Sequence, residues 1–171
     1  MMILVIGGSG SGKSAWAEGM IAKSRCQRRY YIATMQAADG ESLARVRRHR
    51  AQRAGIGFET IERPRDIGAL RLQADSAALA EDIPNLLANE MFGGGDWERI
   101  VPGMEALSSQ CDLLIAVTGD VFRDGISYDD GTLEYLRRLA AVNRALAARA
   151  DAVVEVVYSI PTLLKGALPC D

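Results

Sequence analysis

The chain has 171 residues, of which 49% are hydrophobic and 25% are charged, and its formal net charge at pH 7 is −2. A chain of this size and composition can bury a sizeable core, so we expect residues 1–171 to form a single domain. The small negative charge gives no general attraction to nucleic acid or to acidic membranes. Any binding of an anion must therefore come from a local cluster of residues.

The cysteines and the apolar runs bear on the compartment of the protein. Cys26, Cys111 and Cys170 are odd in number and far apart, and their spacing matches neither a zinc site nor a disulfide framework. This usage favours a reducing environment. No apolar run reaches the roughly 18 residues that a membrane span requires. We therefore expect a cytoplasmic protein without a membrane span.

Strands and helices are expected to alternate along the chain. Residues 2–6 form a continuous apolar run, which is typical of a strand buried on both faces. Further strands are predicted over residues 30–33, 58–61, 69–74, 113–117 and 153–157. Helices are predicted over residues 14–25, 40–54, 97–109, 132–150 and 77–91, the last of them kinked or split by Pro84. This alternation indicates βαβ units and a mainly parallel sheet, and so an α/β fold.

A glycine-rich segment directly follows the first strand. It reads Gly7-Gly8-Ser9-Gly10-Ser11-Gly12-Lys13-Ser14 and matches the phosphate-binding pattern G-x-x-x-x-G-K-[ST]. Glycines let the backbone curl around phosphate oxygens, and the next helix adds its positive N-terminal end. We expect Lys13 to reach the β- and γ-phosphates and Ser14 to help hold Mg²⁺. The alternative is a glycine-rich turn that binds nothing, but the flanking strand and helix favour a site for a purine nucleoside triphosphate.

The only histidine lies in a strongly basic segment, which reads Arg45-Val46-Arg47-Arg48-His49-Arg50-Ala51-Gln52-Arg53. At helical spacing, Arg45, His49 and Arg53 line one stripe. Like charges at this spacing destabilise a helix unless an anion such as a triphosphate lies between them. Cationic neighbours also favour the neutral imidazole, which can attack a phosphorus atom. The alternative is a solvated basic face with an incidental histidine.

Several of these segments together resemble one known family. The sequences ILVIGGSGSGKS near the start, YYIATM over residues 30–35 and RVRRHRAQR followed by FETIERP are similar to adenosylcobinamide kinase/adenosylcobinamide-phosphate guanylyltransferase. The segment NRALAARADAVVEVV over residues 143–157 is similar as well. The resemblance implies a P-loop NTPase domain with a RecA-like, mainly parallel sheet flanked by helices. It also implies assembly as a homotrimer.

The resemblance further implies two reactions of cobalamin biosynthesis. The family phosphorylates the hydroxyl of the aminopropanol arm of adenosylcobinamide with ATP or GTP. It then transfers GMP from GTP to that phosphate through a guanylylated histidine. By position His49 is that histidine, and Arg45 and Arg53 neutralise phosphate charge. The implied partners are thus adenosylcobinamide, its phosphate, ATP, GTP and Mg²⁺, with no nucleic acid.

The middle of the chain departs from the family pattern. An acid is expected at the end of a central strand to hold the metal, and an ungapped match puts Ala77 at that position. Asp75 is the predicted substitute, unless it or Ser76 is only a helix N-cap. Asp120 stands for a second family acid and is predicted as a further metal ligand, unless it is an ordinary loop residue. Phe58 replaces a family tryptophan and could stack on a base.

These features leave three functions open. The leading interpretation is the bifunctional enzyme. The second is a divergent relative that uses the same loop to phosphorylate, or the same histidine to nucleotidylate, a different small molecule. The third is a nucleotide sensor without turnover, which stays open because the expected acid is missing at Ala77.

Overall fold

The computed structural model describes residues 1–36, 55–121 and 128–169. The predicted helix over residues 40–54, with Arg45, His49 and Arg53, lies outside this part of the chain. The strands are β1 (Met2–Gly7), β2 (Arg28–Ala33), β3 (Glu59–Glu62), β4 (Ser76–Glu81), β5 (Leu113–Gly119), β6 (Ala152–Val157) and β7 (Ile160–Lys165). The helices are α1 (Lys13–Lys23), α3 (Ile83–Phe92), α4 (Ile100–Ser108) and α5 (Asp130–Arg149), with short 3-10 helices η1 (Ile67–Ala69) and η2 (Trp97–Arg99).

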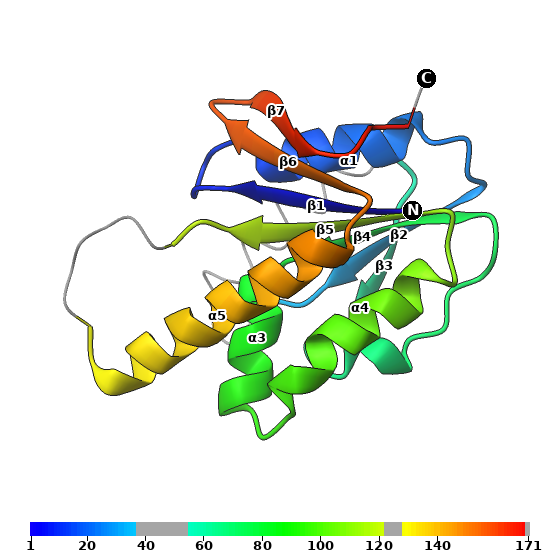
Figure 1. Cartoon of the computed structure of the whole chain (residues 1–171). Coiled ribbons are helices and arrows are strands. Elements are labelled where there is room, and N and C mark those ends of the chain that lie inside the picture. Colours follow the sequence, from blue (N-terminus) through cyan, green and yellow to red (C-terminus); the bar gives the residue numbers. More distant parts are fainter. Residues whose placement is uncertain (37–54, 122–127, 170–171) are drawn as a thin grey trace.

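These seven strands form one sheet in the order β3-β2-β4-β5-β1-β6-β7. Neighbouring strands from β3 to β6 are parallel, and β7 alone among them runs antiparallel, along the outer edge of β6. Helix α1 covers one face of the sheet, and α3, α4 and α5 cover the other (Figure 1). The predicted fold class, a mainly parallel sheet flanked by helices, is confirmed.

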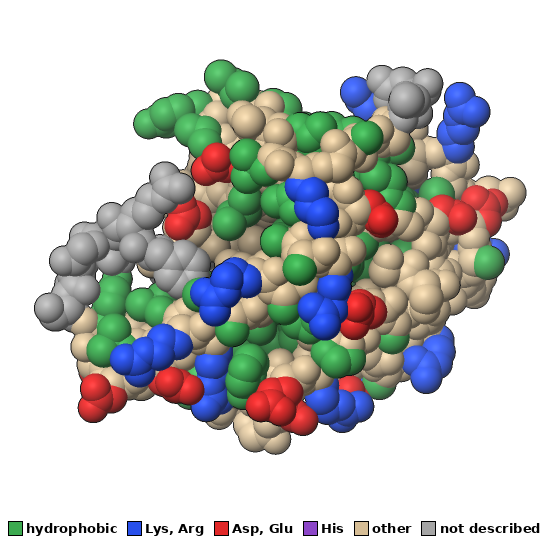
Figure 2. All heavy atoms as spheres, in the orientation of Figure 1, with side chains coloured by type: hydrophobic (Ala, Val, Ile, Leu, Met, Phe, Trp, Pro, Cys, Tyr) green, Lys and Arg blue, Asp and Glu red, His purple; other side chains and the backbone are tan. Residues whose placement is uncertain are grey.

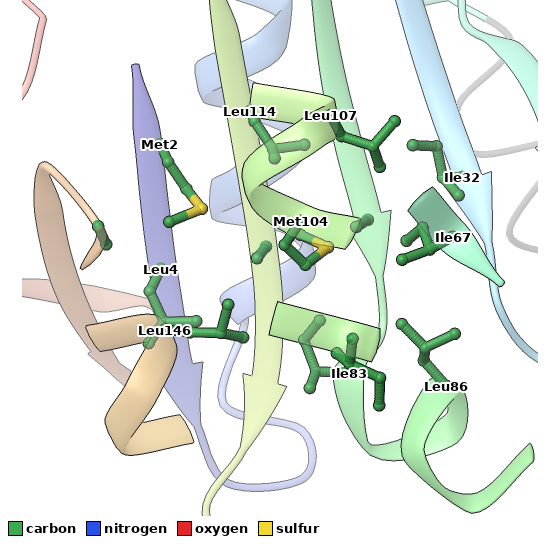
Figure 3. Close-up of a cluster of buried hydrophobic side chains, with 14 of the residues drawn as sticks. Met2, Leu4, Ile32, Ile67, Ile83, Leu86, Met104, Leu107, Leu114 and Leu146 are labelled. Carbon is green, nitrogen blue, oxygen red and sulfur yellow. The ribbon is translucent and has the colours of Figure 1, made fainter. Parts of the chain in front are cut away.

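The apolar strands bury side chains on both faces of the sheet. On the face covered by three helices, side chains from β1, β2 and β5 meet those of α3, α4 and α5 (Figure 3). The labelled members of this cluster are Met2, Leu4, Ile32, Ile67, Ile83, Leu86, Met104, Leu107, Leu114 and Leu146. On the other face, Ile3 and Val5 pack with Ala17 and Ile21 of α1. Burial on both faces explains why β1 and β5 read as unbroken apolar runs.

Two predicted elements in the middle of the chain are wrong. Residues 77–91 are not one helix, because residues up to Glu81 belong to β4 and only α3 is helical. Alanine favours a helix in isolation, but here the Ala77-to-Ala80 run is fully buried between β2 and β5, where small side chains fit. Pro84 lies in the first turn of α3, where a missing N–H has no effect. The strand predicted over 69–74 is absent, since this segment links η1 to β4.

Strand β7 is an element that the sequence did not predict. It is exposed along its whole length, and the apolar side chains of the β6–β7 hairpin that face solvent are Val157, Tyr158, Ile160, Leu163 and Leu164. An exposed strand lacks the buried apolar pattern by which strands are recognised. Within the described ranges, no helix is long and apolar enough to cross a membrane.

Candidate functional site

The glycine-rich segment forms a curled loop between β1 and α1. Gly10 and Gly12 have φ angles of 71° and 90°, which side-chain-bearing residues rarely adopt. The Ser11 N–H donates to the Gly8 carbonyl at 3.2 Å, and the Trp16 N–H donates to the Gly12 carbonyl at 2.9 Å. The loop thus closes on itself and leads directly into α1. Its backbone and the N-terminus of α1 can together accept an anion.

Lys13 and Ser14 occupy the first turn of α1. The Lys13 ammonium donates to the Gly8 carbonyl at 3.2 Å and so spans the loop. The Ser14 hydroxyl points across the sheet edge and donates to Oε1 of Glu81 at 2.6 Å. The structure therefore brings an acid to the phosphate-binding loop, and this acid comes from the end of β4.

The surroundings of the Glu81 carboxylate are typical of a site that binds a cation. Its Oε2 is shielded from solvent and has no hydrogen-bond partner among the residues that the structure describes. Burial raises the pKa of Glu81 to about 7, with Asp82 adding to the rise and the Ser14 hydrogen bond opposing it. A buried oxygen without a partner is costly unless a ligand occupies it. Carboxylate and hydroxyl oxygens are the donors that hard divalent cations prefer, so Ser14 and Glu81 together fit such an ion.

Thr34 fixes the position of Glu81 and its neighbour Asp82. Thr34 is fully buried, and its N–H donates to the Glu81 carbonyl at 3.0 Å. Its hydroxyl oxygen accepts the Asp82 N–H at 2.8 Å. Asp82 in turn caps α3, because its carboxylate accepts the N–H of Asn85 at 2.8 Å. The end of β2 thus holds the turn between β4 and α3 in place.

Burial also raises the pKa of Asp82, and the hydrogen bonds from Asn85 oppose that rise. Two adjacent acids of raised pKa therefore stand at the carboxyl end of β4. The sequence predicts neither of them as a site residue, because its helix over residues 77–91 includes both. The signal that could have found them is Glu-Asp directly after a short apolar run and before Pro84.

Asp120 lies at the same edge of the sheet as the phosphate-binding loop. It follows β5, and its N–H donates to the Gly7 carbonyl at 3.3 Å. The end of β5 is held by α5, since the Thr118 hydroxyl and the Asn143 amide oxygen form a buried hydrogen bond of 2.7 Å. The predicted role of Asp120 as a metal ligand stays a prediction.

Asp75 and Phe58 lie at the opposite edge of the sheet. Asp75 precedes β4, is exposed and accepts the Gln27 N–H at 3.4 Å. Glu81 is six positions further along the chain, about 20 Å of extended strand, so Asp75 does not join the loop site. Phe58 precedes β3 and packs edge-on against Tyr31, with ring centroids 5.8 Å apart. The predicted metal role of Asp75 and the base-stacking role of Phe58 therefore do not fit this site.

Comparison with known proteins places the chain in a family. Residues 3–164 match the family model described as cobinamide kinase / cobinamide phosphate guanyltransferase. The chain is 35% identical over 187 residues to the bifunctional adenosylcobalamin biosynthesis protein CobU of Salmonella typhimurium, covering 96% of this chain and 100% of that protein. It is 32% identical to CobU of Escherichia coli over 185 residues, with the same coverage of each chain. It is 31% identical to CobP of Pseudomonas aeruginosa over 173 residues, covering 97% and 98%.

Among solved structures, the flagellar accessory protein FlaH of Methanocaldococcus jannaschii resembles the chain with a TM-score of 0.54. Sequence identity is 10%, and the match covers 96% of this chain and 78% of FlaH. This likeness concerns the fold alone. The relatives support a role in adenosylcobalamin biosynthesis. Because the family model spans nearly the whole chain, the protein belongs to the cobinamide kinase / cobinamide phosphate guanyltransferase family.

Proposed function

We propose that the protein phosphorylates adenosylcobinamide and then transfers GMP from GTP to the product, giving adenosylcobinamide-GDP. The observation that carries this proposal is the contact between Ser14 of the phosphate-binding loop and Glu81, which supplies a nucleotide site with an acid. Family membership supports the choice of substrate. The sequence leaves a sensor without turnover open only because Ala77 is not acidic, and Glu81 supplies an acid beside the phosphate-binding loop.

In the kinase step, the chain holds the triphosphate and stabilises its charge. The curled backbone from Gly7 to Gly12 offers N–H groups to the phosphates, and Lys13 neutralises charge as the bond to the γ-phosphate breaks. The hydroxyl of the aminopropanol arm attacks the γ-phosphorus and loses its proton, and ADP or GDP leaves. Ser14 and Glu81 would hold Mg²⁺, which would stabilise the negative charge of the phosphates during the transfer. Asp120, which follows β5 at the same edge of the sheet, would be a further ligand of the ion.

In the transfer step, His49 would act as the nucleophile. Its neutral imidazole attacks the α-phosphorus of GTP, a phosphorus–nitrogen bond forms and pyrophosphate leaves. The phosphate of adenosylcobinamide phosphate then attacks the same phosphorus, and the imidazole is released. Arg45 and Arg53 would neutralise phosphate charge in both stages. Support for these three residues comes from sequence spacing and from the family resemblance.

The transfer step is tested with GTP labelled at the α-phosphate. The pure protein is incubated with Mg²⁺ and this GTP, and label that survives denaturation is measured. We expect label that is labile in acid and stable in alkali, and that is absent from His49→Ala. Arg50→Ala, a change in the same basic segment outside the Arg45–His49–Arg53 stripe, is the matched control. Tight GTP binding without covalent label would contradict the transfer step.

The kinase step is tested separately with GTP or ATP labelled at the γ-phosphate. We expect label to pass to adenosylcobinamide in both the parent protein and His49→Ala, because the first reaction does not use the imidazole. Loss of this transfer in His49→Ala, with binding of GTP intact, would contradict the division of roles. Transfer to other small alcohols but not to adenosylcobinamide would favour a divergent kinase.

We also propose that the protein assembles as a homotrimer. The family resemblance supports this state, and the exposed apolar side chains of β7 offer a surface that two further copies of the chain could cover. Sedimentation equilibrium measures the mass directly. A Leu163→Asp variant should shift the trimer toward monomer, and a parent protein that sediments as a monomer at micromolar concentration would contradict the proposal.

A further inference from the structure

The turn between β6 and β7 packs directly on the phosphate-binding loop. The Ser159 N–H donates to the Ser11 carbonyl at 2.7 Å. Ser159 also fills the space that a side chain on Gly12 would need, and the Val156 carbonyl lies 2.6 Å from where a Cβ on Gly7 would stand. The two glycines at the ends of the loop are thus required partly because the β6–β7 hairpin approaches so closely. The hairpin forms one wall of the loop.

The two residues of this turn adopt an unusual backbone conformation. Val157 pairs with Ile160, so Tyr158 and Ser159 make a two-residue connection. Their φ angles are 49° and 64°, in the left-handed region. Turns of this kind favour asparagine and glycine, and a tyrosine there costs folding free energy. The Tyr158 side chain is 89% exposed and so recovers little of this cost by burial.

The direction of the nucleotide follows from the position of Glu81. Strand β1, which leads into the loop, has β5 on one side and β6 on the other. Ser14 and Glu81 mark the metal end of the triphosphate, on the side of β5 and β4. The nucleoside at the other end of the phosphate chain therefore leaves on the side of β6. Figure 1 shows the β6–β7 turn at the same end of the sheet as the loop that follows β1, and Figure 2 shows hydrophobic side chains protruding along this edge.

We propose that Tyr158 forms the nucleoside wall of the site and that its ring stacks on the purine base. This inference rests on the proposed nucleotide site, but not on which small molecule accepts the phosphate. Aromatic rings stack on any base through their π faces, and the exposed ring is held by a turn that is itself fixed to the phosphate-binding loop. Tyr158 is thus a specificity-determining residue for nucleosides over bare polyphosphates. The base-stacking role that the sequence predicts for Phe58 thus belongs to Tyr158, because Phe58 lies at the amino edge of the sheet.

The test compares the affinities for GTP and for inorganic tripolyphosphate in the Tyr158→Asn variant. Asparagine suits the left-handed turn, so we expect the melting temperature to stay equal or rise. Loss of the ring should weaken GTP binding about 10-fold, while tripolyphosphate binding stays unchanged. Tyr158→Phe should keep the parent affinity for GTP. Leu164→Ala, which trims an exposed apolar side chain of the same hairpin, should leave both affinities unchanged.

Each other outcome overturns the inference in a recognisable way. Unchanged GTP affinity in Tyr158→Asn would remove the stacking role. An equal loss of GTP and tripolyphosphate affinity would show that the turn only shapes the phosphate loop. A change in sedimentation without a change in either affinity would assign Tyr158 to contacts between copies. If the parent protein binds neither ligand, the proposed function itself fails, whereas these three outcomes leave it standing.

Discussion

Acids lie at two opposite edges of the sheet, the carboxyl edge where the parallel strands end and the amino edge where they begin. The two groups differ in their exposure to solvent. At the carboxyl edge, the Oε2 atom of Glu81 is shielded from solvent and lacks a partner within the described ranges, while Oε1 accepts the Ser14 hydroxyl of the phosphate-binding loop. At the amino edge, Cys26, Asp75 and Asp112 each place a ligand atom within 4.8 Å of the others, but both acids are exposed. Exposed acids often gather without a ligand, whereas a buried, unpaired one needs a cation or a proton. Burial, and not the number of acids, marks the site.

The largest expected effect is on GTP turnover and follows from the loss of Lys13, which is proposed to contact the phosphates at the carboxyl edge. Lys13→Ala should lower GTP turnover by about 10³-fold, because a charge that stabilises the transition state is lost. Lys23→Ala, an exposed lysine in the last turn of the same helix, is the matched control and should behave as the parent protein. Steady-state kinetics measure both. Equal activity of Lys13→Ala and the parent would mean that this edge is not the reaction site.

The next effect tests the acid itself. Glu81→Gln keeps the size of the side chain but removes the charge that would hold Mg²⁺. We expect Mg²⁺-dependent turnover to fall about 100-fold and the apparent affinity for Mg²⁺ to weaken. Titration of activity with Mg²⁺ separates the two effects. A variant with parent activity at every Mg²⁺ concentration would remove Glu81 from the site.

The raised pKa of Glu81, about 7, predicts two opposite dependences on pH. Without metal, the folded state holds a proton that the unfolded chain loses near pH 4.5, so the free energy of unfolding should fall as pH rises from 4.5 to about 7. With Mg²⁺, turnover should instead rise through about pH 7, because only the carboxylate binds the ion. Chemical denaturation and kinetics across this range measure the two curves. Glu81→Gln should make the metal-free curve less steep and leave only the part that the raised pKa of Asp82 contributes. An unchanged slope in the variant would assign the dependence to another group.

The smallest effect is expected at the amino edge. Asp75→Asn should keep turnover within about twofold of the parent, since an exposed side chain far from the loop contributes little to either chemistry or stability. Its carboxylate accepts only a weak bond from the Gln27 N–H, so the melting temperature should change little. The same assays as for Glu81→Gln apply. A large loss of Mg²⁺-dependent turnover would reverse the comparison and return the metal site to Asp75.

Elements with a strong local signal could be predicted from the sequence. The run Met2-to-Ile6 followed by the Gly7-to-Ser14 motif specified a buried strand, a curled loop and a helix, and all three are present. Local patterns suffice there because burial on both faces and the glycine spacing leave few other conformations. The helical spacing of apolar residues likewise sufficed to predict α5, whose buried residues include Leu139, Asn143 and Leu146.

Tertiary structure decided the rest of the site. The Ala77-to-Ala80 run has helical propensity, and only its position between β2 and β5 makes it a strand. Because β4 runs parallel to β1, its carboxyl end and not its amino end lies beside the loop. The acid of the site is therefore Glu81, at the end of β4, and not Asp75, which precedes it. The β6–β7 hairpin could not be predicted from local sequence either. Strand β7 is exposed and lacks a buried apolar pattern, and the contact between Ser159 and Gly12 joins residues far apart in the sequence. Residue spacing alone determined the phosphate-binding loop. The acid and the hairpin beside the loop depend instead on the order of the strands, which places β4 two strands from β1 on one side and β6 next to β1 on the other.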